Sequence, residues 1–173
     1  MPSEIITFST LEVLFEKEKL RDIFNNEILK KSNSGIDRIS ASEFAANLDS
    51  SLELIKKKIL DGSYKFSPYT EKLIIKGRNK FPRVISIPTI RDRIVIDILK
   101  KYLQEVFCDS VSHDLPNVFI KKIKEHIDSQ RRPIFYYKTD ISSFFDSLDH
   151  NILYNKLQSK IEDVEILKLI ANV

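Results

Sequence analysis

The sequence predicts an α+β fold in which helices outnumber strands, and three observations support this prediction. Apolar residues recur at helical spacing through most of the 173 residues. Two β-rich runs flank a polar loop that contains glycine, and a third follows Pro133. The resulting order of helices, hairpin, helices, strand and helices is typical of an α+β chain. With 42% hydrophobic residues, the chain has enough apolar surface for a packed core.

Two capping boxes mark the starts of the first helices. In Ser9–Glu12 and again in Ser40–Glu43, a serine precedes a glutamate by three residues. Apolar residues at helical spacing extend the first helix to about Lys31. The second helix is expected to stop at Asp61-Gly62, because glycine commonly ends a helix.

An extended region follows the second helix. The runs Lys72–Ile75 and Arg83–Ile87 are β-rich, and the polar loop between them contains Gly77, so we expect a β-hairpin. Pro82 stands at the start of the second run, where a strand tolerates proline. A helix from about Ile90 to Phe107 is expected next, with its apolar residues facing inward.

The remainder is predicted as a helix, a strand and two further helices. Val118–Ser129 carries apolar residues on one helical face. The run Ile134–Tyr137 predicts a short buried strand that ends near Asp140. Helices are expected near Asn151–Gln158 and Val164–Ala171.

Composition restricts the setting of the protein. Cys108 is the single cysteine, so no internal disulfide forms, and we expect this thiol to be a small core residue. The N-terminus lacks signal-peptide character and no apolar run is long enough for a membrane span, so we expect a cytoplasmic protein without a membrane partner.

The net charge of +3 conceals a basic block. Lys56–Lys101 contains 13 Lys or Arg and 4 Asp or Glu, which predicts a polyanion-binding surface, with an ordinary solvated face as the alternative.

The run Tyr137–His150 carries the most specific chemical signal. Asp140 follows the predicted strand, and Phe144-Phe145-Asp146 comes next. A carboxylate at a strand end can bind Mg²⁺, which prefers oxygen ligands and supports phosphoryl transfer. An aspartate in this place can equally cap the turn that follows.

This run resembles the first catalytic-aspartate motif of reverse transcriptases, especially the bacterial lineage of group II introns, retrons and defence-associated enzymes. The resemblance implies that Asp140 binds magnesium ions and that the main-chain carbonyl of Ile141 is a further ligand. It also implies that Phe145 is the steric gate that excludes a 2′-hydroxyl group. Core packing is the alternative for this aromatic pair, and we expect it to be the main role of Phe144.

The predicted hairpin resembles the fingers of the same family. There a lysine and an arginine fold over the triphosphate of the incoming nucleotide, and Lys76 and Arg83 hold the corresponding places. Lysine offers a point charge and arginine a bidentate fork for phosphate oxygens. An ordinary exposed basic hairpin is the alternative.

The segment after the hairpin resembles the family as well. The resemblance implies that Arg91 and Arg93 approach the template or the nucleotide, while a structural salt bridge with Asp92 or Asp97 is an equally open role for one of them. Upstream, Ser34–Asp37 resembles a family landmark whose expected role is to turn the chain.

By this resemblance, residues 1–133 form N-terminal helices and fingers, and residues 134–173 form the start of a palm, within one truncated unit. No Tyr-x-Asp-Asp motif follows Asp140, although two-metal chemistry needs several carboxylates. The region Ser112–Val118 also lacks the Gly-Phe-Arg of many relatives. We therefore expect a fragment of an RNA-directed DNA polymerase that is inactive alone.

The parent enzyme would use Mg²⁺, an RNA template and primer, and deoxynucleoside triphosphates. Two alternatives stay open. The chain could be a catalytically dead nucleic-acid-binding module, or a subunit that a second chain completes, with a role in phage defence.

Overall fold

The computed structural model describes residues 11–30, 33–75, 77, 82–110, 116–129, 135, 137, 139–141 and 143–173. Helices dominate these residues, and two strands form the described sheet. The elements are α1 (Leu11–Leu14), α2 (Lys17–Ile23), the π-helical turn η1 (Phe24–Ile28), α3 (Ala41–Ala46), α4 (Leu48–Leu60), β1 (Thr70–Ile74), β2 (Arg83–Ile87), α5 (Ile90–Val106), η2 (Cys108–Ser110), α6 (Pro116–Ser129), η3 (Phe145–Ser147), α7 (His150–Gln158) and α8 (Val164–Ala171).

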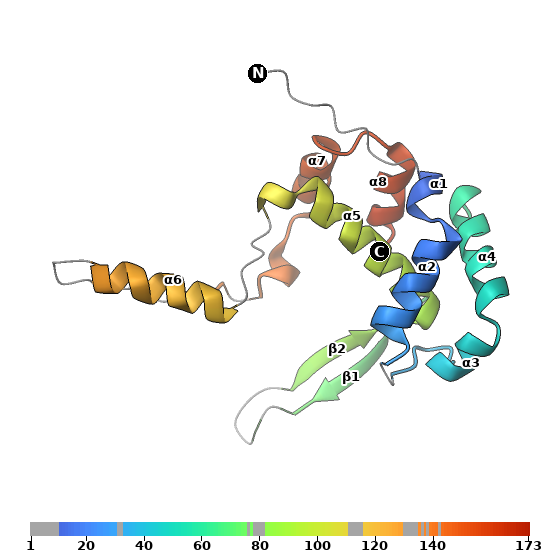
Figure 1. The fold of residues 1–173 in the computed structure, drawn as a ribbon, viewed down its shortest axis with the longest axis horizontal. Helices are drawn as coiled ribbons and strands as arrows, with labels where there is room; N and C mark the ends of the chain where they lie inside the picture. The colour runs from blue at the N-terminus through green and yellow to red at the C-terminus, as the bar shows by residue number, and fades with distance from the viewer. Residues whose placement is uncertain are drawn as a thin grey trace.

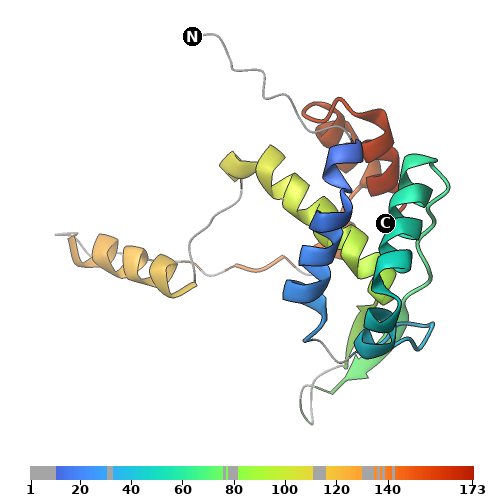
Figure 2. The same ribbon diagram turned by 45° about the vertical axis from the view of Figure 1, so that its right-hand side comes forward.

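The hydrophobic core lies among α1, α2, α4, α5 and α8 (Figures 1 and 2). Helix α5 supplies the largest share of it, and α2 packs against both α5 and α4. Leu20 and Ile94 are fully buried where α2 and α5 contribute to this core. Ile166 of α8 is also fully buried, so the last helix completes a core that the first helices begin.

The first predicted helix is interrupted, which corrects the expectation of one continuous helix to Lys31. Its capping residue Ser9 lies outside the described residues. The chain leaves helical geometry after Leu14, and α2 begins at Lys17. An unbroken helix would place positions 15 and 20 about 140° apart. The interruption lets both Phe15 and Leu20 be completely buried.

The second capping box is confirmed. The Ser40 hydroxyl accepts from the Glu43 amide at 3.2 Å, and the Ser40 amide donates to the Glu43 carboxylate at 2.7 Å. The helix that follows is divided at Asn47 into α3 and α4, which the sequence prediction did not include. The predicted stop is confirmed, since Gly62 follows α4 with a φ of 70° that glycine adopts without strain.

The hairpin prediction is also confirmed. Strands β1 and β2 pair antiparallel, with Thr70 opposite Ile87 and Ile74 opposite Arg83. The first strand begins two residues before the predicted start at Lys72. The hairpin extends away from the helical core (Figure 1).

Helix α5 matches its prediction within one residue, but the expectation for Cys108 is wrong. Val106 is the last buried residue of α5, and Cys108 follows it in η2, where its side chain is exposed. The physical reason is that the helix has already ended, so the chain turns away before the thiol reaches the core.

Helix α6 forms as predicted, yet none of its residues is buried. It lies apart from the core in both ribbon views (Figures 1 and 2). Phe119 and Ile123, on its predicted apolar face, are 55% and 45% exposed. The periodicity therefore predicted the helix correctly, while its apolar face has no covering among the described residues.

The predicted buried strand before Asp140 is wrong for the residues that the structure describes. Phe135 and Tyr137 are 86% and 92% exposed and belong to no strand. Ile134 and Tyr136 lie outside the described residues. A lone strand leaves its backbone groups without partners, and the described sheet consists of β1 and β2 alone.

Helices α7 and α8 are confirmed. The side chains of Asp149 and Asp163 cap their first turns by accepting from main-chain amides. The described elements thus agree with a helix-rich α+β chain. None of the described helices combines the length and apolar character needed to cross a membrane.

Candidate nucleic-acid interface

The register of the hairpin places two cations on one face. Cross-strand partners project to the same side of a sheet, and that side alternates along each strand. Lys72 is opposite Ile85 and Arg83 is opposite Ile74, so Lys72 and Arg83 are diagonal neighbours. We call the side that carries Thr70, Lys72, Ile74, Arg83, Ile85 and Ile87 the basic face.

The basic face carries no acidic side chain. Glu71 is the one acid of the two described strands, and its pairing with Ser86 places it on the opposite face. Neither Lys72 nor Arg83 forms an ion pair with a described residue, and both are exposed. Diagonal neighbours lie about 7–8 Å apart, close enough for both cations to contact one phosphate group or two successive ones.

The basic face is the more protected side of the hairpin. Its Ile85 and Ile87 are 38% and 9% exposed, whereas Leu73 and Val84 on the other side are 65% and 51% exposed. The two cations therefore lie on the face of the hairpin whose apolar residues are the less exposed.

The resemblance of the hairpin pairs Arg83 with Lys76 and does not include Lys72. Lys76 lies outside the described residues. The strand alternation could have identified Lys72, because positions 72, 74 and 76 share a face in any continuous strand.

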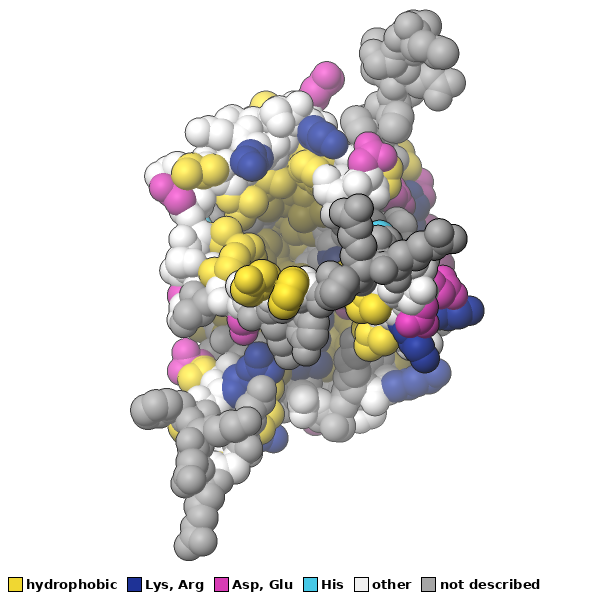
Figure 3. Space-filling view, turned by 90° about the vertical axis from the view of Figure 1, so that its left-hand side faces the viewer, with side chains coloured by type: hydrophobic (Ala, Val, Ile, Leu, Met, Phe, Trp, Pro, Cys, Tyr) yellow, Lys and Arg dark blue, Asp and Glu magenta, His cyan; other side chains and the backbone are white. Residues whose placement is uncertain are grey.

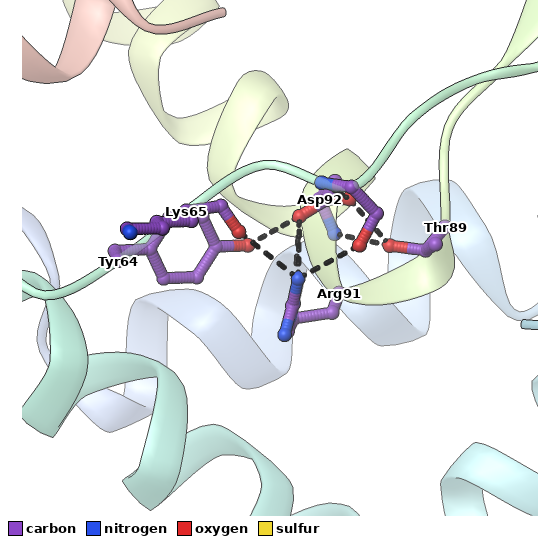
Figure 4. A network of polar contacts seen from close by, with 6 residues as sticks. Tyr64, Lys65, Thr89, Arg91 and Asp92 are labelled. Carbon is purple, nitrogen blue, oxygen red and sulfur yellow. Dashed lines mark hydrogen bonds and ion pairs between the residues drawn. The ribbon is translucent and has the colours of Figure 1, made fainter.

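The hairpin begins and ends at a buried polar cluster, shown in Figure 4. Asp92, in the first turn of α5, is 1% exposed. Its carboxylate accepts from the Tyr64 hydroxyl at 2.7 Å, from the Ser67 amide at 3.0 Å and from the Thr89 hydroxyl at 2.7 Å. Burial raises the pKa of Tyr64, and the hydrogen bond to Asp92 raises it further, so the phenol keeps its proton and donates.

Arg91 lies against the same cluster. Its guanidinium is 3.4 Å from the Asp92 carboxylate, and it donates to the Lys65 carbonyl at 3.1 Å and to the Ser67 hydroxyl at 2.9 Å. It also lies 5.2 Å from the centre of the Tyr64 ring. The structural ion pair with Asp92 is therefore present, and the predicted contact with template or nucleotide stays a prediction.

Arg93 holds a different segment to the start of α5. Its guanidinium donates to the Pro88 carbonyl at 3.1 Å and to the Asn33 carbonyl at 2.6 Å. Burial lowers the pKa of Arg93, while Asp37 and Asp97 oppose the change. These bonds fix the turn that precedes α3 beside the end of β2.

Gly35 allows the turn before α3 to lie directly against the backbone at the start of α5. A Cβ at position 35 would lie 2.6 Å from the Thr89 Cα and 2.7 Å from the Thr89 nitrogen. The segment Ser34–Asp37, which was predicted to turn the chain, therefore also makes a close backbone contact with Thr89. Only glycine leaves room for it, although its φ angle is not in the left-handed region.

The residues predicted for catalysis are exposed. Asp140 forms no hydrogen bond or ion pair with any described residue, and Ile141 is 66% exposed. Phe145 is 81% exposed and meets Phe144 edge to face, with ring centres 5.3 Å apart. Phe144 is itself 44% exposed, so its expected role in the core is wrong.

The described residues do not fit a magnesium centre. Among them, no three His, Cys, Asp or Glu side chains gather closely enough to hold a metal ion. Asp140 with the carbonyl of Ile141 would offer too few oxygen ligands and too little negative charge for two divalent ions. Further carboxylates are required for metal-assisted chemistry at this position.

An apolar hollow marks the side of the molecule shown in Figure 3, the left side of Figure 1. Hydrophobic side chains gather there, with lysine and arginine side chains at its margins. Exposed apolar residues are frequent in α6, in the segment before α7 and in α7 itself, including Phe119, Tyr137 and Ile152. Contiguous apolar surface of this kind commonly marks an interaction site.

Comparison with known proteins points to intron-encoded proteins. The chain is 26% identical to the group II intron-encoded protein LtrA of Lactococcus lactis, over 80% of this chain and 24% of LtrA. It is 25% identical to protein YkfC of Escherichia coli K12, over 79% of this chain and 38% of YkfC. It is also 25% identical to the COX1/OXI3 intron 2 protein of Saccharomyces cerevisiae, over 97% of this chain and 20% of that protein. No protein-family model matches the chain.

The chain is thus related to group II intron-encoded proteins, which supports the reverse-transcriptase-like relationship that its motifs indicate. It spans less than two fifths of the length of each relative.

Proposed function

We propose that this chain is the fingers and the beginning of the palm of an RNA-directed DNA polymerase, and that its hairpin binds phosphate groups. The observation that carries the proposal is the basic face, where Lys72 and Arg83 are diagonal neighbours without an acidic partner. A polyanion gains most from such a pair, because neither cation must first leave an ion pair. The relationship to intron-encoded proteins makes RNA the polyanion that we expect.

In this proposal Asp140 supplies one carboxylate of a polymerase site. The remaining acidic ligands come from sequence other than these 173 residues, either further along the same polypeptide or in a second chain. Phe145 then lies beside the sugar of the incoming deoxynucleotide, and Mg²⁺ binds only when the full set of carboxylates is assembled. The exposed apolar residues around Asp140 favour this view, because they offer surface for additional strands.

RNA binding tests the proposal. The affinity of the chain for a single-stranded RNA would be measured at several salt concentrations, by fluorescence anisotropy, for the wild type and for Lys72→Ala and Arg83→Ala. We expect each substitution to weaken binding about fivefold and to reduce the slope of log affinity against log salt by about 0.7, the value of one phosphate contact.

Lys156→Ala is the matched control. It removes the same charge from an exposed position in α7, which lies outside the basic block. Equal losses in all three variants would show that only net charge matters, and would contradict a phosphate site on the hairpin.

Primer extension tests the catalytic part of the proposal. With an RNA template, a primer, deoxynucleoside triphosphates and Mg²⁺, we expect no synthesis by the 173-residue chain alone. Synthesis that disappears in Asp140→Ala would show that these residues already contain a complete site. The alternative, a nucleic-acid-binding module without catalytic function, predicts that Asp140→Ala does not change RNA affinity. This holds for the chain alone and for the chain assembled with the missing carboxylates.

A further inference from the structure

We infer that Asp92 is a positioning residue that sets the direction of the hairpin, and through it the placement of Arg83. The inference rests on the proposed function, since it concerns how the phosphate-binding face is held. It comes from the buried cluster of Figure 4, which the sequence did not predict beyond an ion pair between Asp92 and a neighbouring arginine.

Both ends of the hairpin are tied to this one carboxylate. Ser67 lies three residues before β1, and Thr89 lies two residues after β2. The main-chain amide of Ser67 and the hydroxyl of Thr89 both donate to the same oxygen of Asp92, Oδ2, at 3.0 and 2.7 Å. A single buried atom therefore joins the chain that enters the hairpin to the chain that leaves it.

The second oxygen, Oδ1, strengthens the attachment of the entering chain. It accepts from the Tyr64 hydroxyl at 2.7 Å and faces the Arg91 guanidinium at 3.4 Å. Arg91 in turn donates to Lys65 and Ser67, so the segment before β1 is held at several points. The side-chain atoms of the cluster leave no buried polar group unsatisfied among the described residues.

The position of Asp92 makes it a rigid reference for the hairpin. Asp92 belongs to the first turn of α5, and the following turns of α5 are part of the core through Ile94 and Val95. The two strands carry little buried surface of their own, because Ile87 is their one buried residue. We call the cluster that joins the two ends of the hairpin to Asp92 the hairpin root; it consists of Tyr64, Ser67, Thr89, Arg91 and Asp92. The direction of the strands relative to the core therefore depends on the hydrogen bonds of this root rather than on packing along the strands.

Asp92→Asn is the informative substitution. It keeps the size of the side chain but replaces one acceptor oxygen with an NH₂ group. Either Oδ2 no longer accepts from Ser67 and Thr89, or Oδ1 no longer accepts from Tyr64, so the chain that enters the hairpin loses part of its attachment in both cases. A loosened root lets Arg83 sample directions that do not meet the phosphate, and affinity falls because part of the population is not competent to bind.

A double-mutant cycle separates positioning from general loss of stability. RNA affinity would be measured for the wild type, Asp92→Asn, Arg83→Ala and the double variant, at a temperature where circular dichroism shows all four to be folded. We expect Asp92→Asn to weaken binding about fivefold in the wild-type background and by less than about twofold in the Arg83→Ala background. Inorganic triphosphate as a second probe shows whether the site favours a free triphosphate or the RNA backbone.

Two variants complete the design. Tyr64→Phe removes one donor to Asp92 and keeps the ring, and we expect a smaller loss of affinity in the same direction, so the inference is testable even if Asp92→Asn fails to fold. Val106→Ala destabilises the core at the opposite end of α5 from Asp92, about 21 Å away along the helix, and we expect it to leave the affinity of the folded protein unchanged.

The outcomes are distinct. If Arg83→Ala leaves RNA affinity unchanged, the proposed phosphate site itself is wrong. If Arg83→Ala weakens binding but Asp92→Asn and Tyr64→Phe have no effect, or have the same effect with and without Arg83, the inference about Asp92 is overturned and the phosphate site stands.

Discussion

Replacing Gly35 with alanine is a sharp test of how the hairpin root is built. The new methyl carbon would lie 2.6 Å from the Thr89 Cα, 2.7 Å from the Thr89 nitrogen and 3.0 Å from the Pro88 carbonyl carbon. Carbon atoms pack at about 3.5–4.0 Å, so the two backbones must separate by roughly 1 Å. Thr89 caps α5 and Arg93 holds both Pro88 and Asn33, so neither side can move freely.

The expected cost follows from two opposing effects. Overpacking against backbone costs about 1–3 kcal/mol. Alanine also restricts the unfolded chain, which stabilises the protein by about 0.4–1 kcal/mol where the native backbone accepts it. We expect a net loss of about 1–2 kcal/mol, which lowers the melting temperature of a chain of this length by about 2–8 °C.

Urea unfolding followed by far-ultraviolet circular dichroism measures this loss. Asn33→Ala is the control, because it changes an exposed side chain of the same turn and keeps the carbonyl that Arg93 contacts, and we expect it to alter stability by less than about 0.5 kcal/mol. If Gly35→Ala were as stable as the wild type, or more stable, the close contact with Thr89 could not be a constraint on the fold.

Three further predictions concern the core, the capping box and the catalytic aspartate. Ile94→Ala should lower the free energy of unfolding by about 2–5 kcal/mol in the same urea experiment, because the side chain is completely buried. Ser40→Ala should cost about 1 kcal/mol at neutral pH, as the loss of an N-cap does. Hydrogen bonds from Ser40 lower the pKa of Glu43 below 4.5, so their contribution is present above pH 4.5 and lost as the pH falls through the folded value. Urea curves at pH 3 and pH 7 should therefore show a smaller difference between Ser40→Ala and the wild type at pH 3, and an undiminished difference would contradict the capping-box pairing. Asp140→Ala should leave the melting temperature unchanged within about 1–2 °C, since the side chain is exposed, while it abolishes primer extension by an assembled polymerase; a marked drop in stability would assign Asp140 a structural role.

Local chemistry allowed much of this fold to be predicted from the sequence. The capping box at Ser40, the stop at Gly62 and the two strands depend on residues that are neighbours in the chain, so their patterns are visible without tertiary information. The interruption after Leu14 could not be predicted in this way. It exists because Phe15 and Leu20 must both reach the core, and that requirement comes from helices more distant in sequence.

In the candidate site, too, some features follow from local sequence and others only from the three-dimensional structure. Arg83 could be predicted from its motif, whereas Lys72 required the register of the strands and Asp92 required the three-dimensional meeting of residues 25 to 28 positions apart along the chain. The strand expected before Asp140 failed for a related reason. Its composition favours extended backbone, but a strand forms only where a neighbour can pair with it, and composition cannot supply that neighbour.

The contribution of α8 to the core has a consequence for the order in which the protein folds. Ile166 and Leu169 share one hydrophobic cluster with residues as early as Leu14 and Leu20. Closing a loop of that length is slow compared with forming the local helices, and during synthesis the early helices emerge from the ribosome long before α8 does. We expect the nascent chain to keep an open apolar surface until about residue 170 is available, which makes this interval the one in which a chaperone or an incorrect partner can bind.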